Sequence, residues 1–315
     1  SLDNNAVEMF DLPNNTPKIN MEGIPKIKSK SKVRKENDEQ RYNVLVLDTS
    51  ASSSFLDSSG NIFYTADTAI DYVKASAKKF IEGVQKADGT NYVAIVEYKG
   101  STANVVSEFS TDFVSLNAAI DGLYASQNTR NVAAGLQKAD TLINEISNPK
   151  AIKNVVLFTT GMTNDGEYSY DGHYNEDTIG SEWRRSDTQV RLYAYSNAAY
   201  AMAETLKSKA TVYSVGLFQM MENMPEEGLE IVQFFKLFSS ELATSLEHFY
   251  DVKDPNDLEF IFGEIADKVT TKDVNFYFAS GEEKDYEAVC HYSDNYFRKA
   301  SCGTRQLLSL IHISE

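Results

Sequence analysis

The chain has 315 residues, with 30 Lys or Arg against 46 Asp or Glu, and therefore a net charge of −16. Binding of nucleic-acid phosphates requires a basic surface, so this charge excludes nucleic acid as an expected partner. Hydrophobic residues make up 42% of the chain, which indicates a folded protein rather than a disordered one. No apolar run of about 18 residues occurs, so we expect no membrane insertion in this fragment.

Residues 1–41 are rich in Asn, Pro and Lys and lack a sustained hydrophobic period, which is typical of a linker or a disordered segment. Their basic run from Lys26 to Lys35 fits a solvated linker, with contact to an anionic surface as the alternative. This fragment shows no signal peptide. Residues 307–315 resemble a translated sequencing-adaptor tail, so we expect them to be non-native; a native amphipathic strand is the alternative.

From residue 42 onward, short apolar runs alternate with amphipathic stretches. In chain order, the pattern predicts strand 42–48, helix 65–85, strands 92–98 and 103–109, helices 112–124 and 131–146, strand 154–160, a polar loop at 161–187, helix 186–208, strand 210–218, helix 228–240, strand 248–251 and helix 254–270. Strands that alternate with long helices indicate an α/β fold. We expect a Rossmann-like, doubly wound, mostly parallel central sheet with one antiparallel edge strand and helices on both faces.

Residues 271–306 carry two short apolar runs, at 274–278 and 287–292, and otherwise resist assignment. We interpret them as the possible start of a further β-rich domain. The two cysteines of the chain, Cys290 and Cys302, both lie here. Their spacing matches no metal motif; it fits a disulfide in an exported protein or two free thiols in a cytosolic one.

The first predicted strand ends in a short run of oxygen-bearing side chains: Asp48, Ser50 and Ser52. In open α/β sheets the ligand crevice lies beyond the carboxyl ends of the strands. An Asp and two hydroxyls on one turn can point at one spot, and such hard donors suit Mg²⁺ or another divalent cation. The alternative is a strand-to-helix turn whose serines cap backbone amides.

Several segments between residues 42 and 270 have a distinctive order and spacing. They are the DTSAS motif at 48–52, the hairpin 92–109, the helix opening NVAAGL at 131–136, the strand VVLFTTG at 155–161, the strand TVYSVGL at 211–217 and the closing segment 249–265. Together they resemble the von Willebrand factor type A (VWA) domain, of the kind found in bacterial surface proteins. The resemblance implies a Rossmann-like domain that binds a protein or matrix ligand through a metal-ion-dependent adhesion site, where the ligand's carboxylate completes the metal coordination.

The resemblance also assigns metal ligands, and this chain departs from them at two positions. The family site uses an Asp and two Ser of the first loop, which match Asp48, Ser50 and Ser52. The family's Thr of the second loop has no ungapped match, because Arg130 stands at that position and Thr129 is one residue away. The family's Asp after the fourth strand is absent, since this chain reads Thr-Thr-Gly at 159–161.

These departures leave two alternatives for the predicted site. In one, an incomplete site binds a metal through the first-loop residues with Thr129, helped by Asp165 from the neighbouring loop. In the other, Arg130 forms a charge-assisted pair with Asp48 and occupies the metal position. A guanidinium close to a divalent cation is repelled by it, which favours the second alternative.

The long loop after the fourth strand is a second candidate for ligand contact. It contains Asp165, Tyr168, Tyr170, Tyr174 and Trp183. Tyr and Trp offer contact area together with a polar tip, and this combination suits a protein-binding surface. The alternative is a loop that merely covers the end of the sheet.

The resemblance implies a non-enzymatic adhesion or protein-interaction module, located outside the cell or on a bacterial surface. Its expected partner is a protein of the extracellular matrix, the host or the cell envelope. A structural domain of a larger surface assembly without metal is one alternative, and a metal-dependent α/β enzyme is another. The enzyme is disfavoured because the chain lacks the phosphate-binding G-x-x-x-x-G-K-[ST], the dinucleotide-binding G-x-G-x-x-G and the hydrolase G-x-S-x-G motifs.

Overall fold

The computed structural model describes residues 39–50, 55–56, 62–64, 66–175, 190–218, 226–270, 272–279, 285–293 and 296–302. Residues 37–270 form one compact unit, and the three C-terminal strands belong to a second unit. Among the described residues, no helix combines the length and hydrophobicity needed to cross a bilayer.

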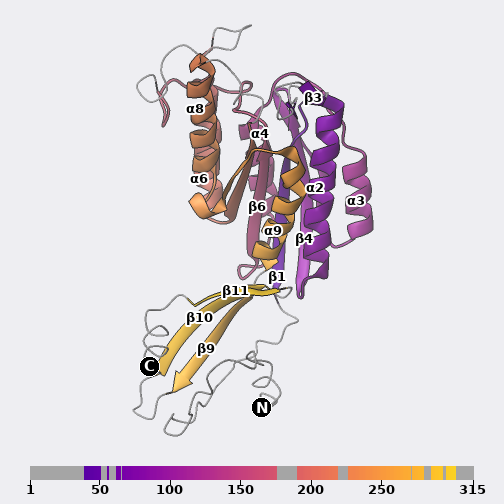
Figure 1. Cartoon of the computed structure of the whole chain (residues 1–315), viewed down its shortest axis with the longest axis vertical. Helices are drawn as coiled ribbons and strands as arrows, with labels where there is room; N and C mark the ends of the chain where they lie inside the picture. Colours follow the sequence, from indigo (N-terminus) through magenta and orange to yellow (C-terminus); the bar gives the residue numbers. More distant parts are fainter. Residues whose placement is uncertain are drawn as a thin grey trace, which may run out of the picture. The chain divides into compact units, whose positions relative to one another are not determined.

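A six-stranded sheet forms the centre of the first unit (Figure 1). Its strands are β1 (Gln40–Asp48), β4 (Thr90–Lys99), β5 (Thr102–Ser110), β6 (Ile152–Thr159), β7 (Thr211–Leu217) and β8 (Phe249–Val252). They lie in the order β5-β4-β1-β6-β7-β8, and every neighbouring pair is parallel except β4 and β5. The predicted mostly parallel sheet with one antiparallel edge strand is therefore confirmed.

Helices cover both faces of this sheet, as expected for a doubly wound fold (Figure 1). One face packs against α4 (Val132–Asn144), α6 (Leu192–Lys207) and α8 (Glu226–Leu242). The other packs against α2 (Ala66–Lys86), α3 (Phe113–Asp121) and α9 (Leu258–Thr270). The remaining short elements are β2 (Phe55–Leu56), β3 (Ile62–Tyr64), η2 (Leu246–His248) and η3 (Pro255–Asp257).

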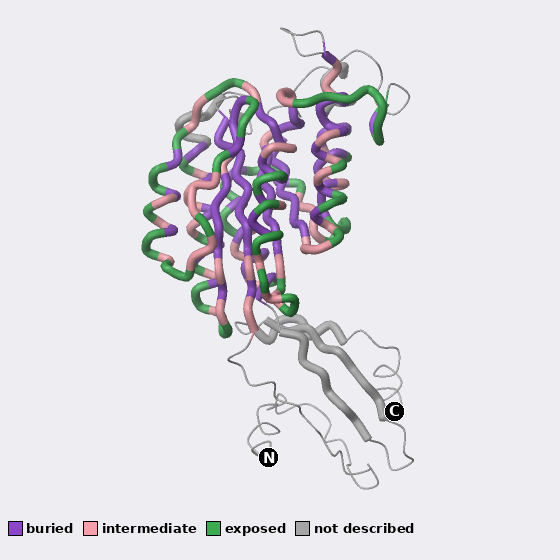
Figure 2. Tube along the Cα trace, turned by 180° about the vertical axis from the view of Figure 1, so that it is seen from behind, coloured by how far each residue is buried: buried purple, intermediate pink, exposed green. Residues whose placement is uncertain are grey.

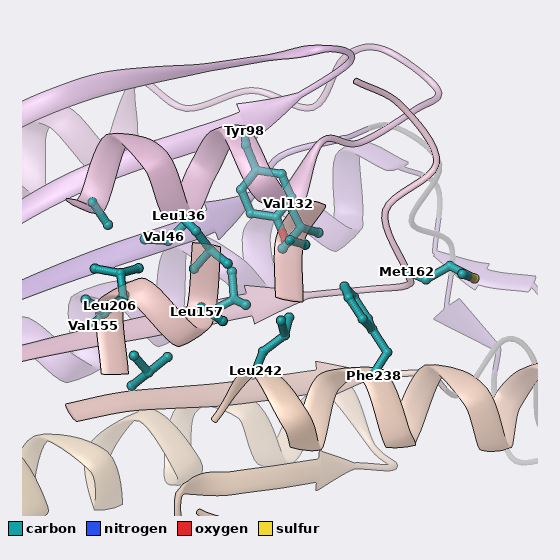
Figure 3. Packing of buried hydrophobic residues seen from close by; sticks show 14 of the residues in the cluster. Val46, Tyr98, Val132, Leu136, Val155, Leu157, Met162, Leu206, Phe238 and Leu242 are labelled. Atoms are coloured by element: carbon teal, nitrogen blue, oxygen red, sulfur yellow. The ribbon is translucent and has the colours of Figure 1, made fainter. Parts of the chain in front are cut away.

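The continuous apolar run of β1 is explained by burial on both faces. Val44 and Val46 belong to the core under α4, α6 and α8, whereas Leu45 and Leu47 belong to the core under α2, α3 and α9. Successive strand residues point to opposite faces, so a strand covered on both sides needs apolar residues throughout. Figure 2 shows this burial along the strands, and Figure 3 shows part of the first core, where Leu136 of α4 packs near the sheet.

The start of α6 differs from the sequence prediction. The predicted helix starts at residue 186, but Val190 and Arg191 are not helical and the helix begins at Leu192. Arg191 adopts an extended backbone at the N-cap, and its side chain forms no capping bond there. Val190 is buried, so tertiary packing of this apolar residue overrides the local preference. The first residues of the predicted helix, 186–189, lie outside the described residues.

The second unit contains a three-stranded antiparallel sheet. Its strands are β9 (Lys272–Ala279), β10 (Asp285–Ser293) and β11 (Tyr296–Cys302), in the order β11-β10-β9. The predicted runs 274–278 and 287–292 fall within β9 and β10, whereas β11 was not predicted because charged residues interrupt its apolar pattern. In the register of β10 and β11, Cys290 stands opposite Cys302.

Candidate functional site at the carboxyl edge of the sheet

The carboxyl ends of β1 and β6 meet where the winding of the sheet reverses. From β1 the chain builds β4 and β5 on one side and then returns to place β6 on the other side. Ligands of open α/β sheets bind at this kind of position, because the connections diverge there and leave a crevice. Asp48 is the last residue of β1, and Thr160 directly follows β6.

The carboxylate of Asp48 is buried and accepts four hydrogen bonds. Its Oδ1 accepts from the backbone N–H of Ser50 at 3.0 Å and from the Ser50 hydroxyl at 2.6 Å. Its Oδ2 accepts from the backbone N–H of Thr160 at 3.1 Å and from the Thr160 hydroxyl at 2.8 Å. Both oxygens are therefore satisfied by the ends of the two central strands.

Arg130 forms a buried ion pair with this carboxylate. Its Nε lies 3.1 Å from Asp48 Oδ2, and the two side chains are 9% and 0% exposed. The same N–H also lies 3.4 Å from the hydroxyl oxygen of Ser50. Gly161 makes room for the guanidinium, since a Cβ at that position would lie 2.3 Å from Arg130 Nη1. The arrangement is a buried ion pair in which the guanidinium of Arg130 offsets the charge of the Asp48 carboxylate inside the protein.

The backbone of Arg130 is fixed by the loop that follows β6. The N–H of Arg130 donates to the side-chain oxygen of Asn164 at 2.8 Å, and the N–H of Asn164 donates to the Arg130 carbonyl at 3.0 Å. The hydroxyl of Thr163 donates to the same carbonyl at 3.2 Å. These bonds fix the backbone of Arg130 against the loop that follows β6.

Thr129 and Asp165, both predicted as metal ligands or helpers, are bonded to each other. The Thr129 hydroxyl donates to Asp165 Oδ2 at 2.5 Å, and Asp165 Oδ1 accepts from the N–H of Gly166 at 2.7 Å. Gly166 has a φ of 96° and lies against Asn131, which caps α4 by accepting from the N–H of Ala134. Only glycine adopts this φ without strain. The hydroxyl of Thr129 therefore links two loops through its hydrogen bond to Asp165.

A buried tyrosine lies below this network. Tyr98 donates its hydroxyl to the carbonyl of Phe158 at 2.7 Å, and its ring belongs to the same apolar core as Val132 (Figure 3). Burial, and next the negative charge of Asp48, raise the pKa of Tyr98 well above its ordinary value. The phenol therefore stays protonated at neutral pH and serves as a hydrogen-bond donor inside the fold.

The described side chains at this edge do not fit a divalent cation. A metal at Asp48 would need free oxygen lone pairs and distance from other cations. Here the Asp48 oxygens accept from Ser50 and Thr160, and the guanidinium of Arg130 lies against one of them. Within the described ranges, no group of three or more His, Cys, Asp or Glu side chains is arranged to hold a metal ion.

Two exposed tyrosines form a surface in the loop after β6. Tyr168 is 54% exposed and Tyr170 is 46% exposed, and their rings meet edge to face with centroids 5.9 Å apart. Behind them lie two buried tyrosines of α6: Tyr195 contacts Tyr168 at 5.7 Å, and Tyr193 contacts Tyr170 at 5.9 Å. The buried rings support the exposed rings and limit their motion.

Asn197 of α6 fixes the backbone of the same loop. Its side-chain oxygen accepts from the N–H of Tyr174 at 2.7 Å, and its amide N–H₂ donates to the carbonyls of Ser169 and Tyr174 at 2.9 Å. Gly172 allows this approach, because a Cβ there would lie 2.4 Å from the Asn197 side chain. The loop is thus attached to α6 at both ends of residues 169–174.

Tyr174 is expected at the binding surface, but the structure places it inside. It is 1% exposed and packs against Phe234 and Phe238 of α8, while its hydroxyl donates to Glu241 at 2.6 Å. Burial and then the Glu241 carboxylate raise the pKa of Tyr174 far above its ordinary value, so this hydroxyl stays a donor. Packing against apolar rings makes Tyr174 an anchor of the loop instead of a ligand contact.

Of the other predicted residues, Asp48, Ser50 and Arg130 come together, whereas Ser52 and Trp183 lie outside the described residues. Sequence reasoning missed Thr160 and Asn197. Thr160 stands where the family has an Asp, so its position in the sequence indicated that it could belong to the site. Asn197 interrupts an Ala- and Tyr-rich helix, where an Asn side chain is unfavourable unless it has a specific partner.

Comparison with known sequences supports one domain family. The sequence model of the von Willebrand factor type A domain matches residues 43–163. Among curated proteins, the collagen alpha-1(VI) chain of Xenopus laevis is 25% identical over 99 residues. That match covers 31% of this chain and 10% of the collagen chain, so the chain spans about a tenth of this relative.

Comparison with solved structures shows a shared fold at low sequence identity. The vWF domain of the type V pili tip protein Mfa5 from Porphyromonas gingivalis superposes with a TM-score of 0.53 and 16% identity, over 73% of this chain and 95% of that one. The pilus adhesin SpaC from Lactobacillus rhamnosus GG gives a TM-score of 0.56 and 14% identity, over 82% of this chain and 37% of that one.

Proposed function

This chain contains a von Willebrand factor type A domain, and we propose that it is a non-enzymatic adhesion module that binds a protein ligand without a metal ion. The observation that carries the proposal is the buried ion pair between Arg130 and Asp48 at the carboxyl edge of the sheet. The ligand surface is the part of this edge that carries Tyr168 and Tyr170.

The ion pair argues against metal-mediated capture of a carboxylate. In the family's adhesion site, a ligand carboxylate completes the coordination of a bound cation. Here the positive charge next to Asp48 belongs to Arg130, whose side chain is 9% exposed and cannot present itself to an incoming ligand. Binding energy then has to come from side-chain contact area, and exposed, rigid tyrosines are well suited to supply it.

The same geometry argues against an enzyme that would use Asp48. A carboxylate nucleophile or metal ligand needs an accessible lone pair. The Asp48 side chain is 0% exposed, its oxygens accept hydrogen bonds from Ser50 and Thr160, and it is neutralised by Arg130. This supports an assignment as a binding module.

The proposed location is outside the cell or on a bacterial surface, with a protein of the extracellular matrix, host or cell envelope as the partner. The support is the fold, which is shared with a pilus tip protein and a pilus adhesin. A purely structural domain is the alternative, and the supported pair of half-exposed tyrosines favours a binding module over it.

Binding assays with purified matrix proteins test the proposal. The domain is immobilised and titrated with collagens and matrix glycoproteins, with serum albumin as control, in Mg²⁺ or in EDTA. We expect saturable binding that is equal in both buffers and lost in the double variant Tyr168→Ala, Tyr170→Ala. Binding that EDTA abolishes would contradict the metal-free mode, and binding that survives the double variant would contradict the assigned surface. The absence of saturable binding to the whole panel would overturn the adhesion function.

A further inference from the structure

The exposed tyrosines of the proposed ligand surface alternate with acidic residues. The sequence at 167–171 reads Glu-Tyr-Ser-Tyr-Asp, and all five residues are exposed within the continuous exposed stretch 167–173 (Figure 2). Glu167 and Asp171 therefore flank two aromatic rings within the described stretch 161–175, which contains no Lys or Arg, on a chain whose net charge is −16.

The rings are held in one arrangement, which matters for the energy of binding. Tyr168 and Tyr170 rest on Tyr195 and Tyr193, and Asn197 fixes the backbone between and after them. Aromatic side chains that are already ordered lose little conformational entropy when a ligand arrives. This surface is therefore built for contact before the partner binds.

The chemistry of this surface selects a cation. The face of a tyrosine ring attracts an ammonium or guanidinium group, and a nearby carboxylate increases that attraction. The chain itself contains this geometry at another position, where the ammonium of Lys99 lies 3.8 Å from the centre of the Tyr124 ring and is paired with Glu97 at 3.1 Å. There, one ring, one carboxylate and the backbone carbonyl of Tyr124, which accepts from the ammonium at 3.2 Å, together hold a lysine.

We propose that residues 167–171 bind a lysine- or arginine-rich segment of the partner protein, with the ammonium or guanidinium groups on Tyr168 and Tyr170 and paired with Glu167 and Asp171. The inference rests on the proposed function and adds the chemical class of the ligand. Charge complementarity carries it: two acidic groups and two half-exposed rings lie within five exposed residues, on a supported backbone.

A labelled lysine-rich peptide tests the proposal by fluorescence anisotropy, with the same peptide acetylated at every lysine as the matched ligand control. We expect the unmodified peptide to bind, and we expect acetylation to weaken its binding by about tenfold or more, since acetylation removes the charge and the cation–π and ion-pair donor. The double variant Tyr168→Ala, Tyr170→Ala should lose about tenfold in affinity. The double variant Tyr168→Phe, Tyr170→Phe keeps the rings and should retain binding.

The contribution of the acidic residues is tested separately, with its own control variants. The double variant Glu167→Gln, Asp171→Asn should lower the affinity for the peptide about threefold to tenfold at low salt. The loss should be much smaller at high salt, because salt already screens the attraction that the variant removes. Glu145→Gln neutralises an exposed acid after the far end of α4, and Leu246→Ala truncates an exposed apolar side chain in η2; both should bind like the wild type.

Three results would overturn the proposal. Equal binding of the acetylated peptide would show an uncharged occupant, such as an apolar or proline-rich segment. Unchanged binding in the alanine double variant would show attraction to the protein's general acidity. Lack of binding by the unmodified peptide would exclude a cationic ligand. If a matrix protein still binds through Tyr168 and Tyr170 in that last case, the cationic ligand is wrong while the proposed adhesion function stands.

Discussion

Arg130 Nε lies 3.1 Å from Asp48 Oδ2, and this contact joins the loop before α4 to the end of β1 in the centre of the sheet. The pair is buried, and Gly161 provides the space for the guanidinium. At the carboxyl edge of a doubly wound sheet, a bound ligand or a metal ion usually supplies the charged group. In this domain a side chain of the chain itself supplies the positive charge.

The variant Arg130→Met should lower the free energy of unfolding by about 3–5 kcal/mol, because it leaves the buried charge of Asp48 without its partner. Chemical denaturation measures this. The double variant Asp48→Asn, Arg130→Met should recover a large part of the loss, since it removes both charges. Lys78→Met is the control: its pair with Asp121 is exposed and should contribute less than about 1 kcal/mol. Equal effects of Arg130→Met and Lys78→Met would show that the buried pair contributes little.

Gly161→Ala should disturb the same pair without removing a charge. The new methyl group would lie 2.3 Å from Arg130 Nη1, so the guanidinium must move away from Asp48. We expect a loss of about 1–3 kcal/mol in unfolding free energy. Gly263→Ala in α9 is the matched control, because the nearest atoms to its new methyl lie 3.6 Å away and alanine favours the helix by about 0.5–1 kcal/mol. A stabilising Gly161→Ala would contradict the close contact.

Asn197→Ala should release the tyrosine loop from α6. It removes three hydrogen bonds and leaves the buried N–H of Tyr174 without its acceptor. The unsatisfied N–H alone should lower the free energy of unfolding by about 1–3 kcal/mol. Hydrogen exchange should show faster exchange at the amides of residues 169–174, and ligand affinity should fall with it. Asn144→Ala, which removes an exposed amide at the end of α4, should leave that exchange unchanged. Unaltered protection in Asn197→Ala would show that the loop is held by its aromatic contacts.

Cys290 and Cys302 should form a disulfide when the protein is made in an oxidising compartment. Their positions are opposite in the register of β10 and β11, and opposed residues of antiparallel strands lie about 4.5–5.5 Å apart, within the span of a disulfide. Alkylation followed by mass spectrometry should modify the two thiols only after reduction. Cys290→Ser should leave one thiol that reacts without reduction. Two reactive thiols in unreduced protein from the bacterial periplasm would show that no bridge forms.

The fold could be predicted from the sequence because the strands are buried on both faces. The runs at 42–48 and 154–160 are nearly continuous in apolar residues, and the structure has β1 and β6 there. Helix ends were less accurate. At α6 the buried Val190 decides the start of the helix, and this packing leaves no signal in local sequence.

The site was predictable only in part, because its decisive contacts join distant segments. The loop position of Arg130 and the absence of a carboxylate at Thr160 are visible in the sequence, and they favoured an internal ion pair over a metal. The support of the tyrosine surface was not visible: Tyr193, Tyr195 and Asn197 lie on a helix that follows the loop, and only the folded chain shows that they lie beneath it.

The most direct test of the central claim is a calorimetric titration of Mn²⁺ into the purified wild-type protein, with the isosteric variant Asp48→Asn as the control. Because Arg130 neutralises Asp48 and the carboxylate oxygens are already bonded, we expect no saturable site tighter than millimolar in either protein. A saturable micromolar site in the wild type that Asp48→Asn abolishes would contradict the metal-free site, because it would show that the metal displaces Arg130 from Asp48.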